Sequence, residues 1–473
     1  MQEINTMSVS DATTSQSHLK RTLNSSNLVM MGIGCIVGAG LFSLVGVVAA
    51  ESTGPAIIIS FALAAVACFF SALCYSEFSA MVPLAGSAYS YTKYTMSEFL
   101  AFIIGWDLVL EYALGAATVA VSWSQYLVRF LQSFGLYLPP KLIMSPFETV
   151  TLADGTIVRG YFNCPAAIII IGITLLLVRG ITLTSFVNNI LVTIKILVIF
   201  IFIAIGFFYI NTINHVNFIP ENTGVFGEYG WSGIFRGAAV LFFAFLGFDA
   251  LSTTAQEVKN PQKALPRAIM LALLICTVIY VVFSWILTGM ANYKEFSGNA
   301  APISVAIMKT PFLWLQSGVT IAILVGFMSV IIVQLMAQTR VFYAMSEDKL
   351  LPKTFSDIHP KYQTPYKSHM VFALAVTLLA GFVPVAELGH MVSIGTLLSF
   401  VIVSISVIIL RKTKPDLKRP FKVPLVPLIP ILGTLICIAL MLALPYQTWL
   451  RLIIWMIIGL IIYVSYSRRA KKK

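Results

Sequence analysis

Long apolar runs without a single charge dominate the chain. Residues 52–76 and 310–339 contain no Asp, Glu, Lys or Arg, which makes uninterrupted windows of 25 and 30 residues. A helix of about 20 apolar residues is long enough to cross the roughly 30 Å of hydrocarbon in a bilayer. All such windows together predict twelve spans, near residues 28–50, 55–82, 98–127, 164–180, 184–210, 231–256, 266–291, 311–345, 367–385, 388–411, 425–444 and 447–467. The pattern therefore predicts an all-α integral membrane protein.

Composition excludes a soluble enzyme. Of the 473 residues, 58% are hydrophobic and 11% are charged, and the mean hydropathy is +0.90. An ordinary soluble domain is about 25% charged. The longest predicted segment outside the membrane, residues 128–163, is too short for an independent catalytic or nucleotide-binding domain. The sequence also contains no GxxxxGK[ST] phosphate loop. A carrier, a channel or a receptor remains.

The basic residues predict the orientation in the membrane. The net charge is +12. With twelve spans, both termini lie on the same side of the membrane, and 23 Lys and Arg fall in the tails and loops on that side. Six fall in the loops on the opposite side. Because cytoplasmic loops are enriched in Lys and Arg, both termini are predicted to be cytoplasmic. Residues 1–27 are expected to form a disordered cytoplasmic tail, and residues 468–473 a basic cytoplasmic tail.

Two spans carry glycine-rich interruptions at matching places. The first contains GIGCIVGAGLF, and the sixth contains FFAFLGFDALS with Gly247 and Asp249 in mid-span. Spans that lie five apart cross in opposite directions, which predicts an inverted repeat of residues 28–210 and 231–411, followed by two further spans in 425–467. Paired broken helices of this kind mark the binding site of a transporter. The alternative is that these glycines only allow helices to pack closely.

A broken pair of this kind offers opposite partial charges to the two ends of a zwitterion. The outer half of the first span begins at about Gly40 and offers free N–H groups and a positive dipole end to a carboxylate. The inner half ends near Ile36 and Val37, whose free carbonyl groups suit an ammonium group. The sixth span adds carbonyl groups from the other side, and Asp249 is expected to cap its second half.

Three ionisable residues lie inside predicted spans. Lys195 is far from any other charge in its span, and a Lys at mid-membrane costs at least about 2.5–3.5 kcal/mol, so it is functional or paired by default. The alternative is that it snorkels to the cytosolic interface. Asp107 and Glu111 share one face of the third span. Asp107 is interpreted as an interfacial charge at the helix start. Glu111 is expected either to contact the first break or relay a proton, or to make a structural hydrogen bond.

Four motifs carry a resemblance to a known family. They are GIGCIVGAGLF, GWDLVLEYALG (105–115), FFAFLGFDALSTTAQEVKNPQKALPRAI (242–269) and QTRVFYAMSEDKLLPKTF (338–355). In this order they resemble the cationic amino acid transporter branch of the amino acid–polyamine–organocation superfamily, in its bacterial form. The resemblance implies the LeuT-type fold, with five plus five inverted spans and two extra ones, in the bacterial cytoplasmic membrane.

The resemblance also implies a set of site residues. The residues that would bind the backbone of the substrate are Ile36, Gly38, Ala39, Gly40, Phe243, Ala244 and Leu246. Ala39 stands where relatives have Thr, which puts a hydroxyl contact there in doubt. Lys195 would take the place of a sodium ion between spans 1, 5 and 8, with Ser329 as its hydroxyl partner. Release of its proton would then loosen the first span from the eighth.

Span 8 is expected to read the side chain of the substrate. Gln334 and Gln338 lie on one face of an uncharged window, where unpaired amides are costly. The resemblance implies that Gln334 touches the substrate, whereas interhelical hydrogen bonding is the alternative. Because an amide carries no charge, the pocket is expected to accept neutral or polar side chains.

The sequence thus predicts a secondary transporter that imports an L-amino acid with a proton and is not an enzyme. The proton is the coupling ion, and no cofactor, metal or nucleic acid is expected. An amino acid/polyamine exchanger and a non-transporting amino acid sensor are the alternatives. A small single-span membrane subunit is a further candidate partner, and the sequence does not determine the oligomeric state.

Overall fold

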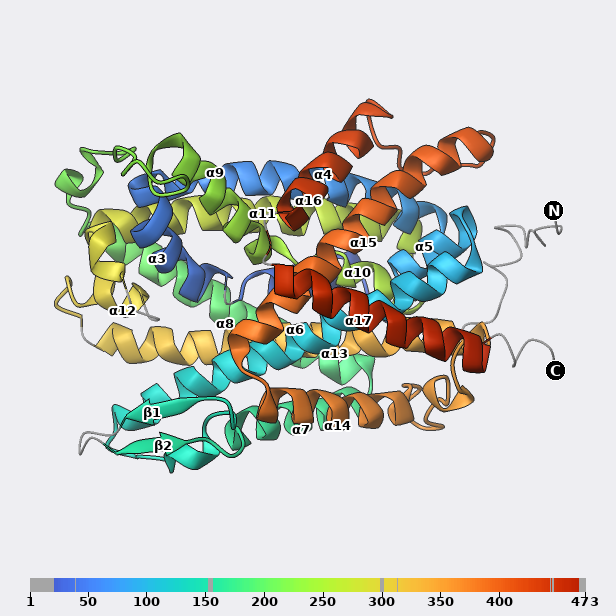
Figure 1. Cartoon of the computed structure of the whole chain (residues 1–473), viewed down its shortest axis with the longest axis horizontal. Coiled ribbons are helices and arrows are strands. Elements are labelled where there is room, and N and C mark those ends of the chain that lie inside the picture. The colour runs from blue at the N-terminus through green and yellow to red at the C-terminus, as the bar shows by residue number, and fades with distance from the viewer. Residues whose placement is uncertain are drawn as a thin grey trace.

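The computed structural model describes residues 21–38, 40–151, 156–297, 302–312, 314–442, 444 and 446–467. Within these residues the protein is a bundle of helices, most of which run along its long axis (Figure 1). The helices are α2 (Ser25–Ile36), α3 (Val45–Val48), α4 (Ile57–Met81), α5 (Ala88–Thr95), α6 (Glu98–Gln132), α7 (Cys164–Val178), α8 (Ile181–Phe207), α9 (Gly230–Leu241), α10 (Ala250–Thr253), α11 (Pro261–Met290), α12 (Pro302–Ile307), α13 (Trp314–Glu347), α14 (Tyr366–Phe382), α15 (Val385–Thr413), α16 (Leu428–Leu442) and α17 (Tyr446–Ile462).

The helices agree with a protein that crosses a membrane several times. In the described part of the chain, eight helical segments are long and apolar enough to span a bilayer, and four shorter apolar helices accompany them. Each of the twelve predicted spans overlaps one of these helices. The short ones, such as the 15-residue α7, are only about 22 Å long at 1.5 Å per residue. The number of complete crossings therefore stays a prediction.

Burial separates central from peripheral helices. In both α6 and α13, 78% of the most apolar window is buried, against 17% in residues 446–466 around α17. Since lipid is the solvent of a membrane protein, the apolar outer face of α17 is as expected for a helix at the rim. The centre of the bundle is thus built around α6 and α13.

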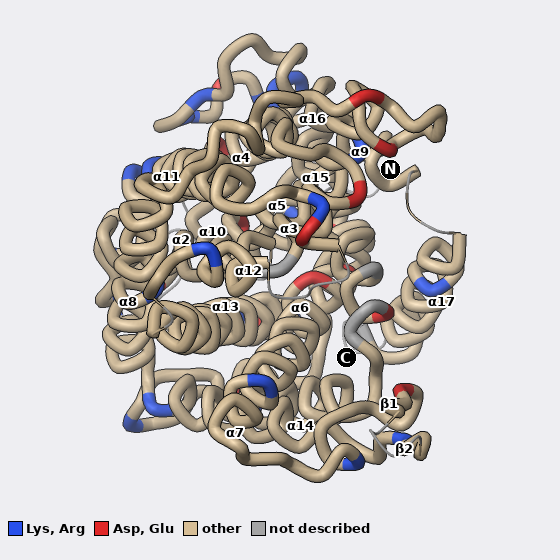
Figure 2. Tube along the Cα trace, turned by 90° about the vertical axis from the view of Figure 1, so that its left-hand side faces the viewer, with Lys and Arg blue, Asp and Glu red and all other residues tan. Residues whose placement is uncertain are grey.

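Charged residues are sparse along the chain. Most of the chain trace in Figure 2 carries neither acidic nor basic residues.

The loop between α6 and α7 contains a small β-hairpin that the all-α prediction did not include. Strand β1 (Thr149–Thr151) pairs antiparallel with β2 (Ile157–Arg159). The alternation of Thr and Val in this short segment is typical of a strand, but spans dominated the sequence pattern. The hairpin lies at the opposite end of the molecule from α5 (Figure 1).

The predicted disordered tail is wrong at its C-terminal boundary. Residues 1–20 lie outside the described residues, but the chain is already ordered from Thr22. The backbone N–H groups of Thr22 and Leu23 both donate to the carbonyl oxygen of Glu257 at 3.0 Å, and Leu23 is buried. The Asn24 side chain then accepts from Asn27 N and caps α2. Backbone pairing with a distant segment, which hydropathy does not reveal, orders these residues.

Candidate functional site

The first break separates α2 from a π-helical turn, Gly40–Leu44. Helix α2 ends at Ile36, and Val37 is extended with φ −76° and ψ 96°. The carbonyl group of Gly38 accepts hydrogen bonds from the N–H groups of Leu41 and Phe42, at 3.2 and 3.3 Å. Ala39, one of the predicted site residues, lies outside the described residues. The helix is thus interrupted within the glycine-rich motif.

The second break follows α9, which continues as a 3₁₀ turn, Phe242–Phe245. Leu246 is extended with φ −63° and ψ 148°. Gly247 has φ 104°, a left-handed conformation that glycine adopts without steric cost. The chain becomes helical again at α10. Of the predicted carbonyl groups, that of Phe243 accepts from Leu246 N at 3.3 Å.

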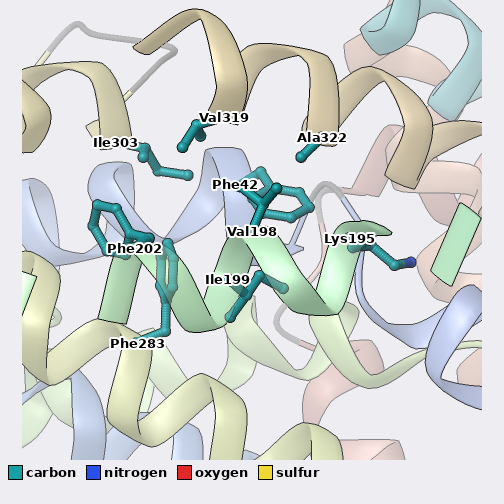
Figure 3. Close-up of a pocket in the computed structure, with 9 residues that line it drawn as sticks. All are labelled: Phe42, Lys195, Val198, Ile199, Phe202, Phe283, Ile303, Val319 and Ala322. Carbon is teal, nitrogen blue, oxygen red and sulfur yellow. The ribbon is translucent and has the colours of Figure 1, made fainter. Parts of the chain in front are cut away.

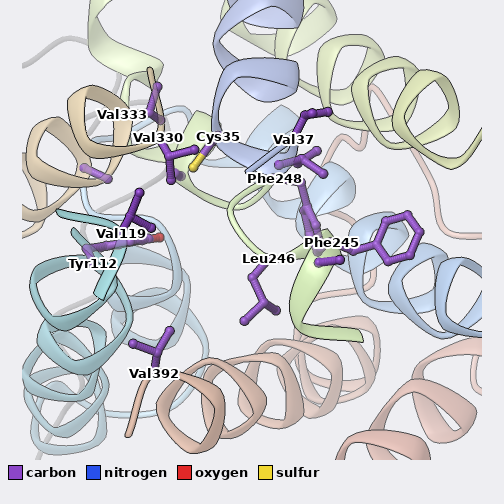
Figure 4. Packing of buried hydrophobic residues seen from close by; sticks show 14 of the residues in the cluster. Cys35, Val37, Tyr112, Val119, Phe245, Leu246, Phe248, Val330, Val333 and Val392 are labelled. Carbon is purple, nitrogen blue, oxygen red and sulfur yellow. The ribbon is translucent and has the colours of Figure 1, made fainter. Parts of the chain in front are cut away.

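The two breaks lie against each other because glycines allow it. A Cβ atom on Gly40 would lie 2.3 Å from the Cβ atom of Ala244, and one on Gly247 would lie 2.4 Å from Cys35 Sγ. Figure 4 shows Cys35 and Val37 near the segment from Phe245 to Phe248, with apolar side chains of α6, α13 and α15 around them. The structure therefore brings the predicted residues of both spans together, apart from Ala39, which it does not describe.

Lys195 of α8 binds the first break. Its Nζ atom donates to the carbonyl oxygens of Val37 at 2.7 Å and Gly34 at 3.0 Å, and lies 2.9 Å from Ser329 Oγ of α13. Ser329 Oγ in turn lies 2.9 Å from the Gly34 carbonyl oxygen. The predicted contact between Lys195 and Ser329 is present. The carbonyl group of Val37, expected to be free for a ligand, instead accepts from this internal ammonium group.

Snorkelling of Lys195 is excluded by its position. The side chain is fully buried, and its nitrogen is hydrogen-bonded inside the bundle. Its aliphatic part borders a small apolar cavity of about 10 Å³ that Phe42, Phe202 and Phe283 also line, while its nitrogen points away from that cavity (Figure 3). An apolar void of this size does not attract water. Carbonyl and hydroxyl groups of the protein therefore solvate the cation.

Tyr280 of α11 joins the two breaks, and the sequence analysis missed it. Its hydroxyl oxygen lies 2.8 Å from the carbonyl oxygens of both Ile36 and Ala244. These are two of the carbonyl groups predicted to face an ammonium group. A hydroxyl group has one hydrogen and can donate to only one of them at a time. A Tyr within an apolar span has no sequence signal that would distinguish it from a packing residue.

Glu111 of α6 lies next to the second break. Glu111 lies beside the Asp249 carboxylate and the Thr396 hydroxyl group, and the hydroxyl group of Tyr112 donates to Asp249. The prediction that Asp249 caps the second half-helix is wrong, because the capping hydrogen bond is absent. Asp249 precedes α10, but its φ of −69° and ψ of −28° are helical and its side chain makes no capping bond. An N-cap side chain needs an extended backbone to reach the helix amides.

Asp107 is not the interfacial charge that was predicted. It is completely buried, nine residues after the start of α6 at Glu98, and its carboxylate accepts from Ser399 Oγ at 3.2 Å. Helix α6 starts at Glu98, as the predicted span does, but packing against Ser399 of α15 buries the residue. The structure thus groups Asp107 with Glu111 in the interior.

Gln334 of α13 faces α6. A Cβ atom on Gly115 would lie 2.7 Å from Gln334 Nε2, so the glycine makes room for this amide. Gln334 Oε1 and both amide atoms of Gln338 are buried without a hydrogen-bond partner among the described residues. Unpaired buried polar atoms are costly and are rare in folded proteins. Contact of Gln334 with a substrate stays a prediction.

A buried ion pair connects the segment after the second break to α13. Both carboxylate oxygens of Glu257 accept from Arg340, at 2.9 Å from Nη2 and 3.0 Å from Nε, and both side chains are about 1% exposed. Charged residues in loop motifs give no indication in sequence of a partner 83 positions away.

Comparison with known proteins agrees with these features. The sequence profile of amino acid permeases matches residues 23–464. The branched-chain amino acid permease BcaP of Bacillus subtilis is 44% identical over 98% of this chain and 96% of its own. The methylthioribose transporter of the same species is 41% identical over 95% and 94%, respectively. A vacuolar cationic amino acid transporter 4 of Arabidopsis thaliana is 37% identical over 84% of this chain and 64% of its own.

The relatives are permeases and transporters, and the described helices agree with a protein embedded in a membrane. The profile covers both breaks, Lys195 and the Glu257–Arg340 pair. The resemblance found in the sequence motifs is thereby confirmed, and the chain belongs to the amino acid permease family of the amino acid–polyamine–organocation superfamily.

Proposed function

We propose that this protein imports a neutral L-amino acid together with a proton by alternating access. The observation that carries the proposal is the ammonium group of Lys195, bonded to the first break at Gly34 and Val37 and to Ser329 of α13. A fixed cation at this point holds the first span to the eighth. Loss of its proton removes the positive charge that these carbonyl groups solvate, and the two helices are then free to separate.

The substrate backbone binds between the breaks. The start of the turn at Gly40 offers amide N–H groups to the carboxylate, since helix starts attract anions. The carbonyl groups of Ile36 and Ala244 accept from the amino group. Because Tyr280 donates to only one of these carbonyl groups at a time, the other is available to the ligand.

The side chain of the substrate is proposed to be neutral. Apolar groups converge on the breaks, among them Leu246, Val119 and Val333 (Figure 4). Gln334 adds an uncharged amide from α13. Two of the relatives are named as branched-chain amino acid permeases, from Bacillus subtilis and Lactococcus lactis, which supports this substrate class. The name of the methylthioribose transporter makes that thiosugar the second candidate substrate.

The proposal includes a topology of twelve spans in the cell membrane, with an inverted repeat of residues 28–210 and 231–411. Both termini are cytoplasmic in this topology, on the basis of the asymmetry of Lys and Arg. The alternatives, exchange against a polyamine and sensing without transport, differ in what moves across the membrane.

Uptake into proteoliposomes tests the proposal. The purified chain is reconstituted, an inward proton gradient is imposed, and labelled leucine, isoleucine, valine, lysine, putrescine and methylthioribose are compared. Accumulation of a neutral amino acid that collapses with a protonophore is expected. Uptake that depends on internal putrescine would show an exchanger, and binding without uptake would show a sensor.

A further inference from the structure

A basic groove lies between the connection from α7 to α8 and the loop before α14. Its volume is about 500 Å³, and it is lined by Arg179, Gly180, Ile181, Thr182, Leu183, Phe186, Lys361, Tyr362 and Gln363. The two walls are held together by the Thr364 hydroxyl group, which donates to the carbonyl oxygen of Val178 at 2.9 Å. The groove is separate from the two helix breaks.

The charge in this groove is uncompensated. The lining contains two basic side chains and, among the residues that the structure describes, no acidic one. Both cations are exposed, and neither forms a salt bridge with a described residue. Lys361 Nζ lies 5.5 Å from the centre of the Tyr362 ring, which holds it over the groove wall. The site is therefore complementary to an anion.

Apolar surface leads away from the groove along the outer faces of both helices. On α8 the exposed side chains recur every three or four residues, which places them on one face. They include Leu183, Phe186, Ile190, Ile194, Leu197 and Ile201. On α7 the exposed side chains are Ile168, Ile171 and Leu175. The groove thus lies where α7 ends and α8 begins, next to two surfaces that suit hydrocarbon.

We propose that this groove binds the headgroup of an anionic phospholipid. The phosphodiester lies between Arg179 and Lys361, and the acyl chains follow the exposed faces of α8 and α7. Basic pockets between membrane helices at the headgroup level recognise such lipids by charge. A free phosphate would use the two cations but not the apolar faces, so the extended apolar surface favours the lipid.

Any lysine or arginine near a membrane surface attracts anionic lipid. The experiment therefore compares two double variants that remove the same charge, one inside the groove and one outside it. The full-length protein is delipidated in detergent and titrated with phosphatidylglycerol or phosphatidylcholine, and the first bound lipid is followed by native mass spectrometry. The double variant Arg179→Gln/Lys361→Gln is compared with Lys263→Gln/Lys412→Gln, which removes the same charge from exposed positions outside the groove.

The groove variant is expected to lose roughly tenfold or more in affinity for phosphatidylglycerol, whereas the control keeps the affinity of the wild type. Hydrogen exchange of residues 180–186 should slow when this lipid binds. Equal losses in both double variants would overturn the proposal, as would equal binding of phosphatidylcholine. Displacement of the lipid by millimolar inorganic phosphate would assign the groove to a soluble anion instead. None of these outcomes depends on the transported substrate.

Discussion

Lys195 of α8 connects its own helix to α2 and α13. Two carbonyl groups and one hydroxyl group solvate its ammonium group in place of water, and they come from α2, the first break and α13. Charge-assisted hydrogen bonds are stronger than neutral ones, and in a dry interior they are not exchanged for bonds to water. The protonation of one side chain can therefore change the contact between the first span and the eighth.

Replacing Lys195 by Met is expected to reduce proton-driven accumulation to the level of protein-free liposomes. Met has a similar length and no charge, so the fold is retained while the cation is lost. Uptake under an inward proton gradient is measured next to the exposed control Lys263→Met, which should transport normally. Undiminished accumulation by a well-folded Lys195→Met protein would refute the coupling role.

Gln334→Ala is expected to change the order in which amino acids compete for uptake. The amide faces Gly115, and its Oε1 atom has no partner among the described residues, so a substrate group can satisfy it. Loss of one neutral hydrogen bond shifts affinities by about 0.5–1.5 kcal/mol. Competition with apolar, polar and basic amino acids is compared with Gln316→Ala, an exposed position on the same helix. An unchanged profile would mean that Gln334 does not line the pocket.

At the scale of elements, backbone pairing and one ion pair join the cytosolic ends of the two broken spans, as they lie in the proposed topology. Leu23 N donates to the carbonyl oxygen of Glu257, and Lys259 N donates to that of Leu23 at 3.1 Å. The Glu257 carboxylate then binds Arg340 of α13. Glu257 takes part in both contacts and thus links the residues before α2, the segment after the second break and α13.

Glu257→Gln is expected to loosen the contact between the cytosolic ends of the two broken spans. Removing one partner of a buried ion pair costs about 3–5 kcal/mol because the other charge stays buried. In a background with Cys35 as the remaining cysteine, an impermeant maleimide applied to inside-out vesicles should label Cys35 several-fold faster than in the parent.

Glu295→Gln is the control for this experiment. It removes the same charge from a half-exposed pair with Lys309 in the loop before α13, and it should leave the labelling rate unchanged. If both variants label at the rate of the parent, the Glu257–Arg340 pair does not limit access to Cys35.

At the scale of the whole molecule, charge asymmetry is expected to set the orientation. With 23 basic residues predicted on one side and six on the other, the positive-inside rule strongly favours one topology. A cysteine added after Lys473 should react with an impermeant reagent only after the cells are opened. Labelling of intact cells would contradict cytoplasmic termini. A cysteine at Thr156, in the β-hairpin loop, should show the opposite pattern.

Sequence alone determined the features that depend on local composition. Charge-free windows located the apolar helices, since the hydrocarbon excludes unpaired charges and backbone groups. A glycine cluster located the first interruption and Gly247 the second, since glycine tolerates the close approach at Gly40 and the conformation of Gly247. The isolation of Lys195 in its span indicated a buried cation, and the resemblance named its partner Ser329.

Tertiary structure decided which distant residues meet. The Tyr280 hydroxyl group reaches Ile36 and Ala244, and the Glu77 carboxylate of α4 binds Arg411 at the end of α15. Hydropathy averages over neighbours along the chain, so it does not tell which faces of two helices pack together. The depth of Asp107, the order from Thr22 onward and the Glu257–Arg340 pair all depend on such packing. Polar groups inside a membrane protein must find partners across helices, and only the assembled bundle supplies them.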